Sequence, residues 1–472
     1  MNFKILSHAC LLVRTENASI VIDPWLLGSC YWRSWWNFPE PDFDEKELAQ
    51  VDAVVISHIH WDHWHGPTLK KLFRGKPVYI PDEPGLRSGE DLGGIGFKEV
   101  IRVPHAETVR VKDIAITMYQ FGLFLNDAAV VIEADGVKVL NANDAKVAGW
   151  ALDNILDRHG PFDFALRSHS SANTRICYSI DGDDAFVPDD RDHYFRSFKA
   201  FMDRVKPRHA IPFASNHCHL HDDVFALNNY ISNPLQLKQF VDDVETPIDW
   251  TLKVMLPGSE WSQARGFELR DEQCFRDLPG ELIAYRERVA DKLDAYRDYE
   301  NRVSISDSIR ERFVALLRSS GALRSGKGGF ALTAFWPDGR EETFTVDLRT
   351  GVLAAVPAMS KPAPGLPLIR MPAVVFRDAV IKNMFHHAGI SKRCRFIASD
   401  ATDLALLRRV LVRLDRSEHG VAPYTGRMVR RLAQAYLRRW RELFVYLHAA
   451  WLIKIRRKPL YLAEEAILRG EL

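Results

Sequence analysis

The side chains best suited to chemistry lie in one short stretch, where residues 58–63 read His-Ile-His-Trp-Asp-His. Alternate residues of an extended segment point the same way, so His58 and His60 can bind one cation. Asp62 and His63 follow in the turn and can face a second cation beside the first. Imidazole suits zinc and iron, and a carboxylate adds charge and holds a bound water. We therefore prefer a metal site to a polar loop that happens to be rich in histidine.

A buried strand has to position this stretch. Residues 51–57 are short, mostly β-branched and apolar, which is typical of a buried strand. The histidines then lie where the strand ends and the chain turns toward a helix that begins near Pro67. Across residues 1–260, short β-branched runs alternate with helical stretches. This alternation predicts an α/β fold, an αββα sandwich in which helices cover two sheets.

The rest of the chain changes in composition. Residues 261–325 lose the strand pattern, become charged and predict a helical connector. Two strand patterns joined by a Pro-Asp-Gly turn and followed by a helical pattern predict a small α+β accessory domain over 326–400. This part weakly resembles a sterol-carrier type module. A helical, basic tail follows over 401–472.

Within the tail, the segment 425–458 is basic and amphipathic. A helix of this kind can lie on an anionic membrane surface, here the inner membrane face, or bind the groove of a partner. The alternative is an ordinary domain helix that buries Trp440, Phe444 and Trp451 in a core. The apolar residues that recur at helical spacing between arginines and lysines are Val429, Leu432, Tyr436, Trp440, Leu443, Phe444, Leu447 and Trp451.

Composition limits the class of protein. A chain of 472 residues predicts two or three domains. The net charge of +1 gives no general attraction to nucleic acid, so we expect no nucleic-acid partner. Six scattered cysteines without a Cys-x-x-Cys pair argue against a disulfide framework or an iron–sulfur centre, and for a reducing, cytoplasmic compartment. Residues 1–5 lead straight into a strand pattern without a signal peptide, and no apolar run is long enough to span a membrane.

The His-x-His-x-Asp-His pattern after an apolar strand resembles the metallo-β-lactamase superfamily. Residues 7–12 and 18–25 resemble the opening hairpin of the branch that holds sugar-lactone hydrolases and N-acyl-phosphatidylethanolamine phospholipases. More similar still is the metallo-β-lactamase-like part of the CMP-N-acetylneuraminate hydroxylase family. The resemblance covers roughly residues 1–260 and implies two divalent cations, zinc or iron. The similar features are Asp23-Pro24-Trp25-Leu26, Trp35-Trp36, residues 67–72 and Asn228-Asn229.

The resemblance also implies further metal ligands. The superfamily adds a histidine after a later strand, and His105 fits that place after Val103-Pro104. It adds an aspartate that bridges both metals, and Asp144 fits at the end of the strand pattern 137–140, unless it caps the helix that follows.

The last histidine of the superfamily pattern is harder to place. His217 is our first choice and His219 the second, with His221 a further alternative. His169 follows another strand pattern and is either a ligand or a catalytic residue that contacts the substrate, beside the catalytic Asp62.

Other residues are candidates for binding the substrate. His8, in the opening hairpin, lines the pocket or is an ordinary hydrogen-bonded histidine. Trp25, Trp35 and Trp36 crowd one loop, where indoles can stack on a sugar or base or contact an acyl chain. An equally good interpretation is a small aromatic core under a long loop. Arg167 can receive a phosphate or carboxylate group.

Two reactions remain open. In the first, two zinc ions lower the pKa of a bridging water toward neutrality and polarise a carbonyl or phosphoryl group. The chain would then hydrolyse a phosphorylated, nucleotide-sugar-like or lipid-like ester or amide, with Asp62 orienting the water. In the second, related to the hydroxylase family, the same ligands hold two irons for oxygenation. That family carries a Rieske domain whose Cys and His motif does not occur here, so a separate redox partner would supply the electrons.

Two further hypotheses remain. A membrane-surface enzyme of the phospholipase type would use the tail to lie beside a lipid substrate. A non-catalytic scaffold would leave a complete metal motif idle.

Overall fold

Two large sheets face each other across a shared core in the computed structural model. The model describes residues 1–470 apart from 123–125, 171–173, 181–190, 246, 325–327 and 457–459. The first sheet has the strand order β19-β18-β1-β2-β3-β6-β7-β8, and β3, β6, β7 and β8 are parallel. Its strands are β1 (Asn2–Ile5), β2 (Leu11–Arg14), β3 (Ser19–Ile22), β6 (Ala53–Val55), β7 (Val78–Pro81), β8 (Val100–Val103), β18 (Glu260–Ser262) and β19 (Gly266–Glu268).

The second sheet has the order β17-β15-β13-β12-β11-β10-β9. Alternate residues of β11 serve two different cores, because successive side chains of a strand point to opposite faces. Val130 and Ile132 pack between the sheets, whereas Ala129 and Val131 pack under the outer helices. Both faces are buried from Ala128 to Ile132, which explains why this stretch of the strand is apolar. The strands are β9 (Thr108–Val111), β10 (Ile114–Phe121), β11 (Asp127–Ala134), β12 (Val137–Asn143), β13 (Phe164–Arg167), β15 (His209–Pro212) and β17 (Thr251–Leu252).

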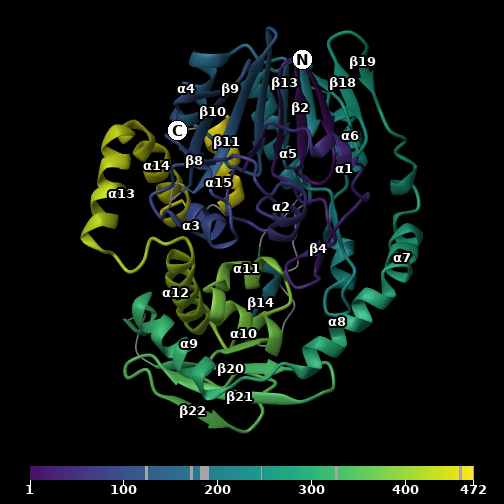
Figure 1. The fold of residues 1–472 in the computed structure, drawn as a ribbon. Coiled ribbons are helices and arrows are strands. Elements are labelled where there is room, and N and C mark those ends of the chain that lie inside the picture. Colours follow the sequence, from purple (N-terminus) through teal and green to yellow (C-terminus); the bar gives the residue numbers. More distant parts are fainter. Residues whose placement is uncertain are drawn as a thin grey trace.

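Helices cover the outer faces of both sheets (Figure 1). The first sheet is covered by α1 (Glu45–Leu48), α2 (Gly66–Leu72) and α3 (Arg87–Gly94). The second is covered by α4 (Trp150–His159), α5 (Arg191–Val205) and α6 (Pro234–Asp242). The predicted αββα sandwich is therefore confirmed.

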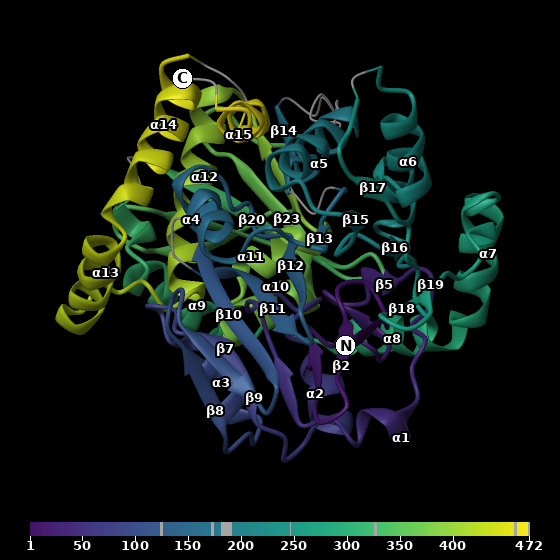
Figure 2. The same cartoon turned by 90° about the horizontal axis from the view of Figure 1, so that it is seen from above.

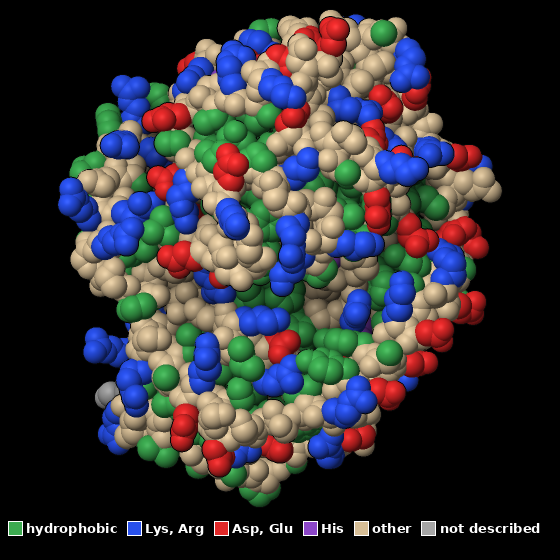
Figure 3. Space-filling view, in the orientation of Figure 1, with side chains coloured by type: hydrophobic (Ala, Val, Ile, Leu, Met, Phe, Trp, Pro, Cys, Tyr) green, Lys and Arg blue, Asp and Glu red, His purple; other side chains and the backbone are tan. Residues whose placement is uncertain are grey.

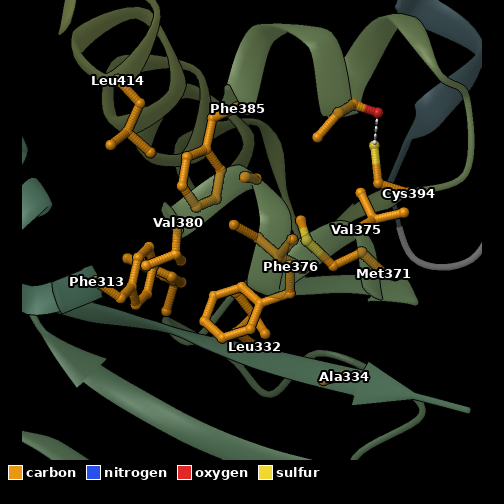
Figure 4. Packing of buried hydrophobic residues seen from close by; sticks show 14 of the residues in the cluster. Phe313, Leu332, Ala334, Met371, Val375, Phe376, Val380, Phe385, Cys394 and Leu414 are labelled. Atoms are coloured by element: carbon orange, nitrogen blue, oxygen red, sulfur yellow. Dashed lines mark hydrogen bonds between the residues drawn. The ribbon is translucent and has the colours of Figure 1, made fainter. Parts of the chain in front are cut away.

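A third sheet, with the order β14-β24-β23-β20-β21-β22, forms the smaller α+β part at the bottom of Figure 1. Phe313, Phe376 and Phe385 pack together over Leu332 of its central strand (Figure 4). Strand β14 comes from the first half of the chain and pairs in parallel with β24. The elements are β14 (Tyr178–Ile180), β20 (Gly329–Phe335), β21 (Glu341–Asp347), β22 (Leu353–Val356), β23 (Leu368–Pro372), β24 (Arg395–Ala398), α9 (Asp307–Ser319), α10 (Ala373–Lys382), α11 (Phe385–Ile390) and α12 (Ala401–Glu418).

Helices α7 (Leu278–Arg288) and α8 (Ala290–Arg302) run along one side from the first part to the second (Figure 1). A buried ion-pair cluster fastens the two parts. Arg393 Nη1 lies 2.7 Å from Glu300 Oε1, and Arg393 Nη2 lies 2.7 Å from Asp223 Oδ2. Removing the Arg393 charge would leave Glu300 buried without its cation, so this contact holds the two parts together.

The tail returns to the first part of the molecule. It consists of α13 (Gly426–Arg438), a short 3₁₀ turn at Trp440–Glu442, α14 (Leu443–Lys454) and α15 (Leu460–Leu468). Figure 2 shows α15 beside α5. Arg457 and Lys458, which we assigned to the basic segment, lie outside the described residues. Among the described helices, none is both long enough and apolar enough to cross a bilayer.

Candidate metal centre

Adjacent strands β3 and β6 place the first part of the centre. Asp23 follows β3 and Ser57 follows β6, so both lie at the same edge of the sheet. Ser57 donates from its backbone N to Asp23 Oδ1 and from its Oγ to Asp23 Oδ2, each over 2.7 Å. Nδ1 of His63 lies 2.8 Å from Asp23 Oδ2. The carboxylate therefore holds the proton on Nδ1 and leaves Nε2 of His63 available as a ligand.

Three groups of ligand atoms overlap at this edge. Within each group the ligand atoms lie within 4.8 Å of one another. His58 and His63 each belong to two groups, so the three groups form one connected cluster of donors suited to divalent cations. The groups are His8 with Asp62 and His63, His58 with His60 and Asp127, and His58 with His63 and Asp144.

Asp144 lies between the two halves of the centre. Its Oδ2 is 3.6 Å from His58 Nε2 and 3.8 Å from His63 Nε2. Oδ1 is buried and has no hydrogen-bond partner among the described residues. Helix α4 begins at Trp150 with Gly149 as its N-cap, so Asp144 does not cap it. Asp144 therefore offers a buried carboxylate oxygen beside both histidines.

Electrostatics show that the centre attracts positive charge. Burial alone would lower the pKa of His63, but the carboxylates of Asp144, Asp62 and Asp23 outweigh burial and raise it to about 10. Burial would raise the pKa of Asp62, yet His63 and His8 hold it well below its usual value. A cation competes with the proton at such a site. Nε2 of His60 and of His63 are also buried without partners among the described residues, so the donor set fits metal ions.

Asp62 is held from two sides. Its Oδ1 accepts a hydrogen bond from the Tyr31 hydroxyl, and its Oδ2 lies 3.2 Å from His8 Nε2. These contacts fix the carboxylate in one orientation beside His63.

Asp127 was missed by the sequence reasoning. It begins β11, opposite Phe121 at the end of β10, and this hairpin brings its carboxylate to His58 and His60. Burial raises the pKa of Asp127, and Asp144 adds to that effect. The signal in the sequence was a polar Asn126-Asp127 pair opening an otherwise apolar strand.

His105 does not join these groups, contrary to our expectation. It follows β8, which is the edge strand two places away from β6. Strands lie about 4.8 Å apart, so the end of β8 lies about 10 Å from the end of β6. His105 lines a different cavity, where its Nε2 lies 3.5 Å from Glu442 of the tail.

The candidates for the last histidine lie beside the three groups. His217 lines the cavity, stacks on Trp35 with ring centres 3.7 Å apart and lies 5.6 Å from the His8 ring. His169 is fully buried, and burial lowers its pKa to about 3. His219 is held by Ser34, with 3.2 Å between its Nδ1 and the serine Oγ. His221 faces the buried Glu300 over 3.5 Å. Their roles stay predictions.

The candidate substrate-binding residues have buried side chains. Trp25 packs edge-on against His8, and Trp36 packs against Tyr285 on the other side of the loop. Arg167 lies over the Phe201 ring, with its guanidinium carbon 4.2 Å from the ring centre. Trp35, like the His217 ring stacked on it, lines the cavity described below. The alternative of a small aromatic core under a long loop therefore describes Trp25 and Trp36 well.

A cavity of about 570 Å³ opens onto the centre. His60, Asp62 and Asp144 are among the residues that line it. The accessory part contributes His386, whose ring stacks on His60 with centres 5.3 Å apart. Phe121, Ile390 and the tail residues Val445, Tyr446 and Ile467 form its apolar walls. Three distant parts of the chain thus enclose one site.

Comparisons with known proteins agree with this geometry in the first part of the chain. Residues 2–151 match the family model of the beta-lactamase superfamily domain. Cytidine monophosphate-N-acetylneuraminic acid hydroxylase of Mus musculus is 34% identical over 146 residues, which is 29% of this chain and 25% of that protein. The protein of that name from Xenopus laevis is 25% identical over 259 residues, 52% of this chain and 44% of that protein. The chain thus spans about a quarter to less than half the length of these curated relatives.

Two solved structures resemble part of this chain. An isothiocyanate hydrolase from Delia radicum gut bacteria has a TM-score of 0.40 at 16% identity and covers 56% of this chain and 98% of its own. CmlA, a diiron β-hydroxylase from Streptomyces venezuelae, has a TM-score of 0.36 at 18% identity and covers 54% of this chain and 52% of its own.

Proposed function

Residues 2–151 carry a beta-lactamase superfamily domain, and from this premise we propose that the chain is a two-metal enzyme that uses iron to hydroxylate its substrate. The observation that carries the proposal is Asp127. Two histidines, His58 and His60, share one group with this carboxylate. Two histidines and one carboxylate with open positions are the ligand set of many non-haem iron oxygenases. The name of the curated relatives, a hydroxylase, supports the same chemistry.

The chain's own residues would divide the work as follows. His58, His60 and Asp127 would hold one metal, and His8, Asp62 and His63 the other, with Asp144 between them. Iron would supply the activation of dioxygen, one atom of which enters a substrate C–H bond while the other becomes water. Two electrons from a separate redox partner and two protons from the solvent would complete the balance. Phe121, Ile390 and Val445 would place apolar surface around the reacting group.

The cavity also suggests the class of substrate. Its apolar walls suit an apolar body, and its polar end presents the reacting carbon to the centre. An amphipathic, lipid-like small molecule fits this division better than a wholly charged one.

Metal content tests the proposal. Protein produced with equal iron and zinc in the medium should retain about two irons per chain and change its absorbance on reduction. Asp127→Asn should weaken iron binding by at least about tenfold, since a lost ligand costs no less than a lost supporting hydrogen bond. Asp242→Asn, at an exposed position of α6, is the matched control and should bind iron normally. Equal iron binding by both variants would refute the role of Asp127.

Hydrolysis by two zinc ions is the second candidate, favoured by the position of Asp144 between the groups. Zinc also accepts two histidines and one carboxylate. In this case Asp62 would orient the attacking water. Zinc-loaded protein should then cleave lactone, amide or phosphodiester probes, and Asp62→Asn should abolish turnover when the two proteins are compared at matched metal content. Protein that retains zinc, excludes iron and cleaves such probes would replace the oxygenase proposal.

A further inference from the structure

Helix α14 is apolar on two opposite faces. Val445 and Leu452 are buried on the inner face, and Tyr446 and Ala449 line the cavity. A helix that is apolar all round is normally covered on every side. The outer face of α14 and the preceding turn is nevertheless between 41% and 69% exposed. Its residues, spaced by three or four and so on one side, are Trp440, Phe444, Leu447, Trp451 and Ile455.

Helix α13 extends this apolar face. Val429 and Leu437 lie two turns apart on one side of α13 and are 51% and 74% exposed. Met428 is buried on its other side. We call the exposed apolar residues of α13, α14 and the turn between them the tail face.

Basic side chains surround the tail face. Within 425–456, all of which the structure describes, the acidic side chain is that of Glu442, which is buried against Arg439. Figure 3 shows Lys and Arg side chains beside hydrophobic ones at the left edge, over α13 and α14. The exposed basic residues are Arg427, Arg430, Arg438, Arg441, Lys454 and Arg456.

Two kinds of partner that could cover the tail face, a domain core and a second copy of the chain, fit it poorly. The sequence left open that Trp440, Phe444 and Trp451 are buried in a domain core, and the structure leaves all three exposed. A second copy of the chain would bring two sets of exposed arginines together, because a twofold interface pairs the same patch with itself. Like charges across an interface oppose binding.

We propose that the tail face docks the protein on an anionic lipid surface. Large aromatic and aliphatic side chains would enter the boundary between headgroups and acyl chains, and the six exposed basic residues would contact the headgroups. Docking places α14 between the lipid and the cavity, so that an apolar substrate has a short path to the centre. This last consequence rests on the proposed function, whereas docking itself does not.

Vesicle sedimentation with the full chain tests the docking. Vesicles of equal phosphatidylglycerol and phosphatidylcholine should carry the protein down, and pure phosphatidylcholine vesicles should bind much less. Point variants are preferable to removing the tail, since Val445 and Leu468 belong to the core under the second sheet. Metal content is measured on the same samples, so that a failure of docking and a failure of the proposed enzyme chemistry are seen separately.

The apolar variant combines Leu437→Ser, Leu447→Ser and Ile455→Ser. It should lower the partition coefficient by at least about tenfold, because one large apolar side chain alone contributes about that factor when fully buried. The matched control, at exposed positions elsewhere, is Leu269→Ser, Ile283→Ser and Val352→Ser, which are 48%, 52% and 60% exposed in the parent. The control should bind as the parent does.

The charge variant combines Arg427→Gln, Arg430→Gln and Lys454→Gln. Each basic side chain near an anionic surface contributes about fivefold, so binding should fall steeply and should weaken with salt in the parent. Absence of parent binding to anionic vesicles would overturn the proposal and favour an acidic protein as the occupant. Equal loss in the apolar variant and its control would overturn it as well.

Discussion

Replacing Asp23 by Asn should weaken metal binding at His63 although Asp23 touches no metal. In the parent, His63 Nδ1 donates to the Asp23 carboxylate over 2.8 Å, which leaves Nε2 free to bind a cation. The Asn side chain can still accept from the Ser57 backbone N through its oxygen. Its NH₂ then faces His63 Nδ1 and donates to it, so the ring proton moves to Nε2, the ligand position. The Asn side chain also tolerates the positive φ of +48° at this position.

Loss of a supporting partner of this kind costs about 10–100-fold in metal affinity, or about 1.4–2.7 kcal/mol. Competition with a chromophoric chelator measures this directly on matched preparations. One charge-assisted hydrogen bond is also lost, so the metal-free protein should be less stable by about 1.5–3 kcal/mol in urea unfolding.

Ser57→Ala distinguishes the effect of Asp23 on the His63 tautomer from a general disturbance of the site. It removes the Ser57 Oγ contact with Asp23 and leaves the contact between Asp23 and His63. Its effect on metal affinity should be clearly smaller than that of Asp23→Asn. Unchanged affinity in Asp23→Asn, with the fold intact by circular dichroism, would refute the tautomer argument.

Three further outcomes follow from the structure. Metal loading at pH 8 in weak buffer should release about one proton per chain from His63. The pKa of about 10 keeps the ring of His63 protonated in the metal-free protein, whereas a histidine that binds a metal must be neutral. An indicator dye measures the release. Arg393→Met should destabilise the chain by about 3–5 kcal/mol in urea unfolding, since it leaves Glu300 buried without its cation; Arg265→Met, at an exposed position, should have little effect. Phe376→Ala should cost about 3–5 kcal/mol, because the side chain is fully buried between Phe313 and Phe344 and leaves a cavity.

Local pattern was enough to predict the parts of the centre that depend on one strand and its turn. The apolar run before His58 became β6, and the alternating histidines came out on one side as expected. Asp144 also follows a strand directly and lies beside His58 and His63. His105 could not, since strand order within the sheet decides how far β8 lies from β6 and no local pattern reveals that order.

Contacts between segments far apart in the sequence explain the features of the site that the local pattern did not predict. Asp127 reaches the centre through the hairpin of β10 and β11, whose register fixes where its first residue lies. His386 stacks on His60 although more than 300 residues separate them in the sequence. The tail pattern was recognised as amphipathic, but a pattern of spacing does not say which side faces the cavity and which faces outward.

The position of α14 in the chain has a consequence for synthesis. Both large sheets are complete once Glu268 has been made, whereas the cavity wall on α14 begins at Leu443. The ribosome adds about 5–20 residues per second, so the 174 residues in between take roughly 9–35 s. During that interval the ligands on β6, β11 and β12 have emerged while the wall that later shields them does not yet exist. Metal can therefore reach the ligands of the nascent chain before α14 covers that side of the cavity.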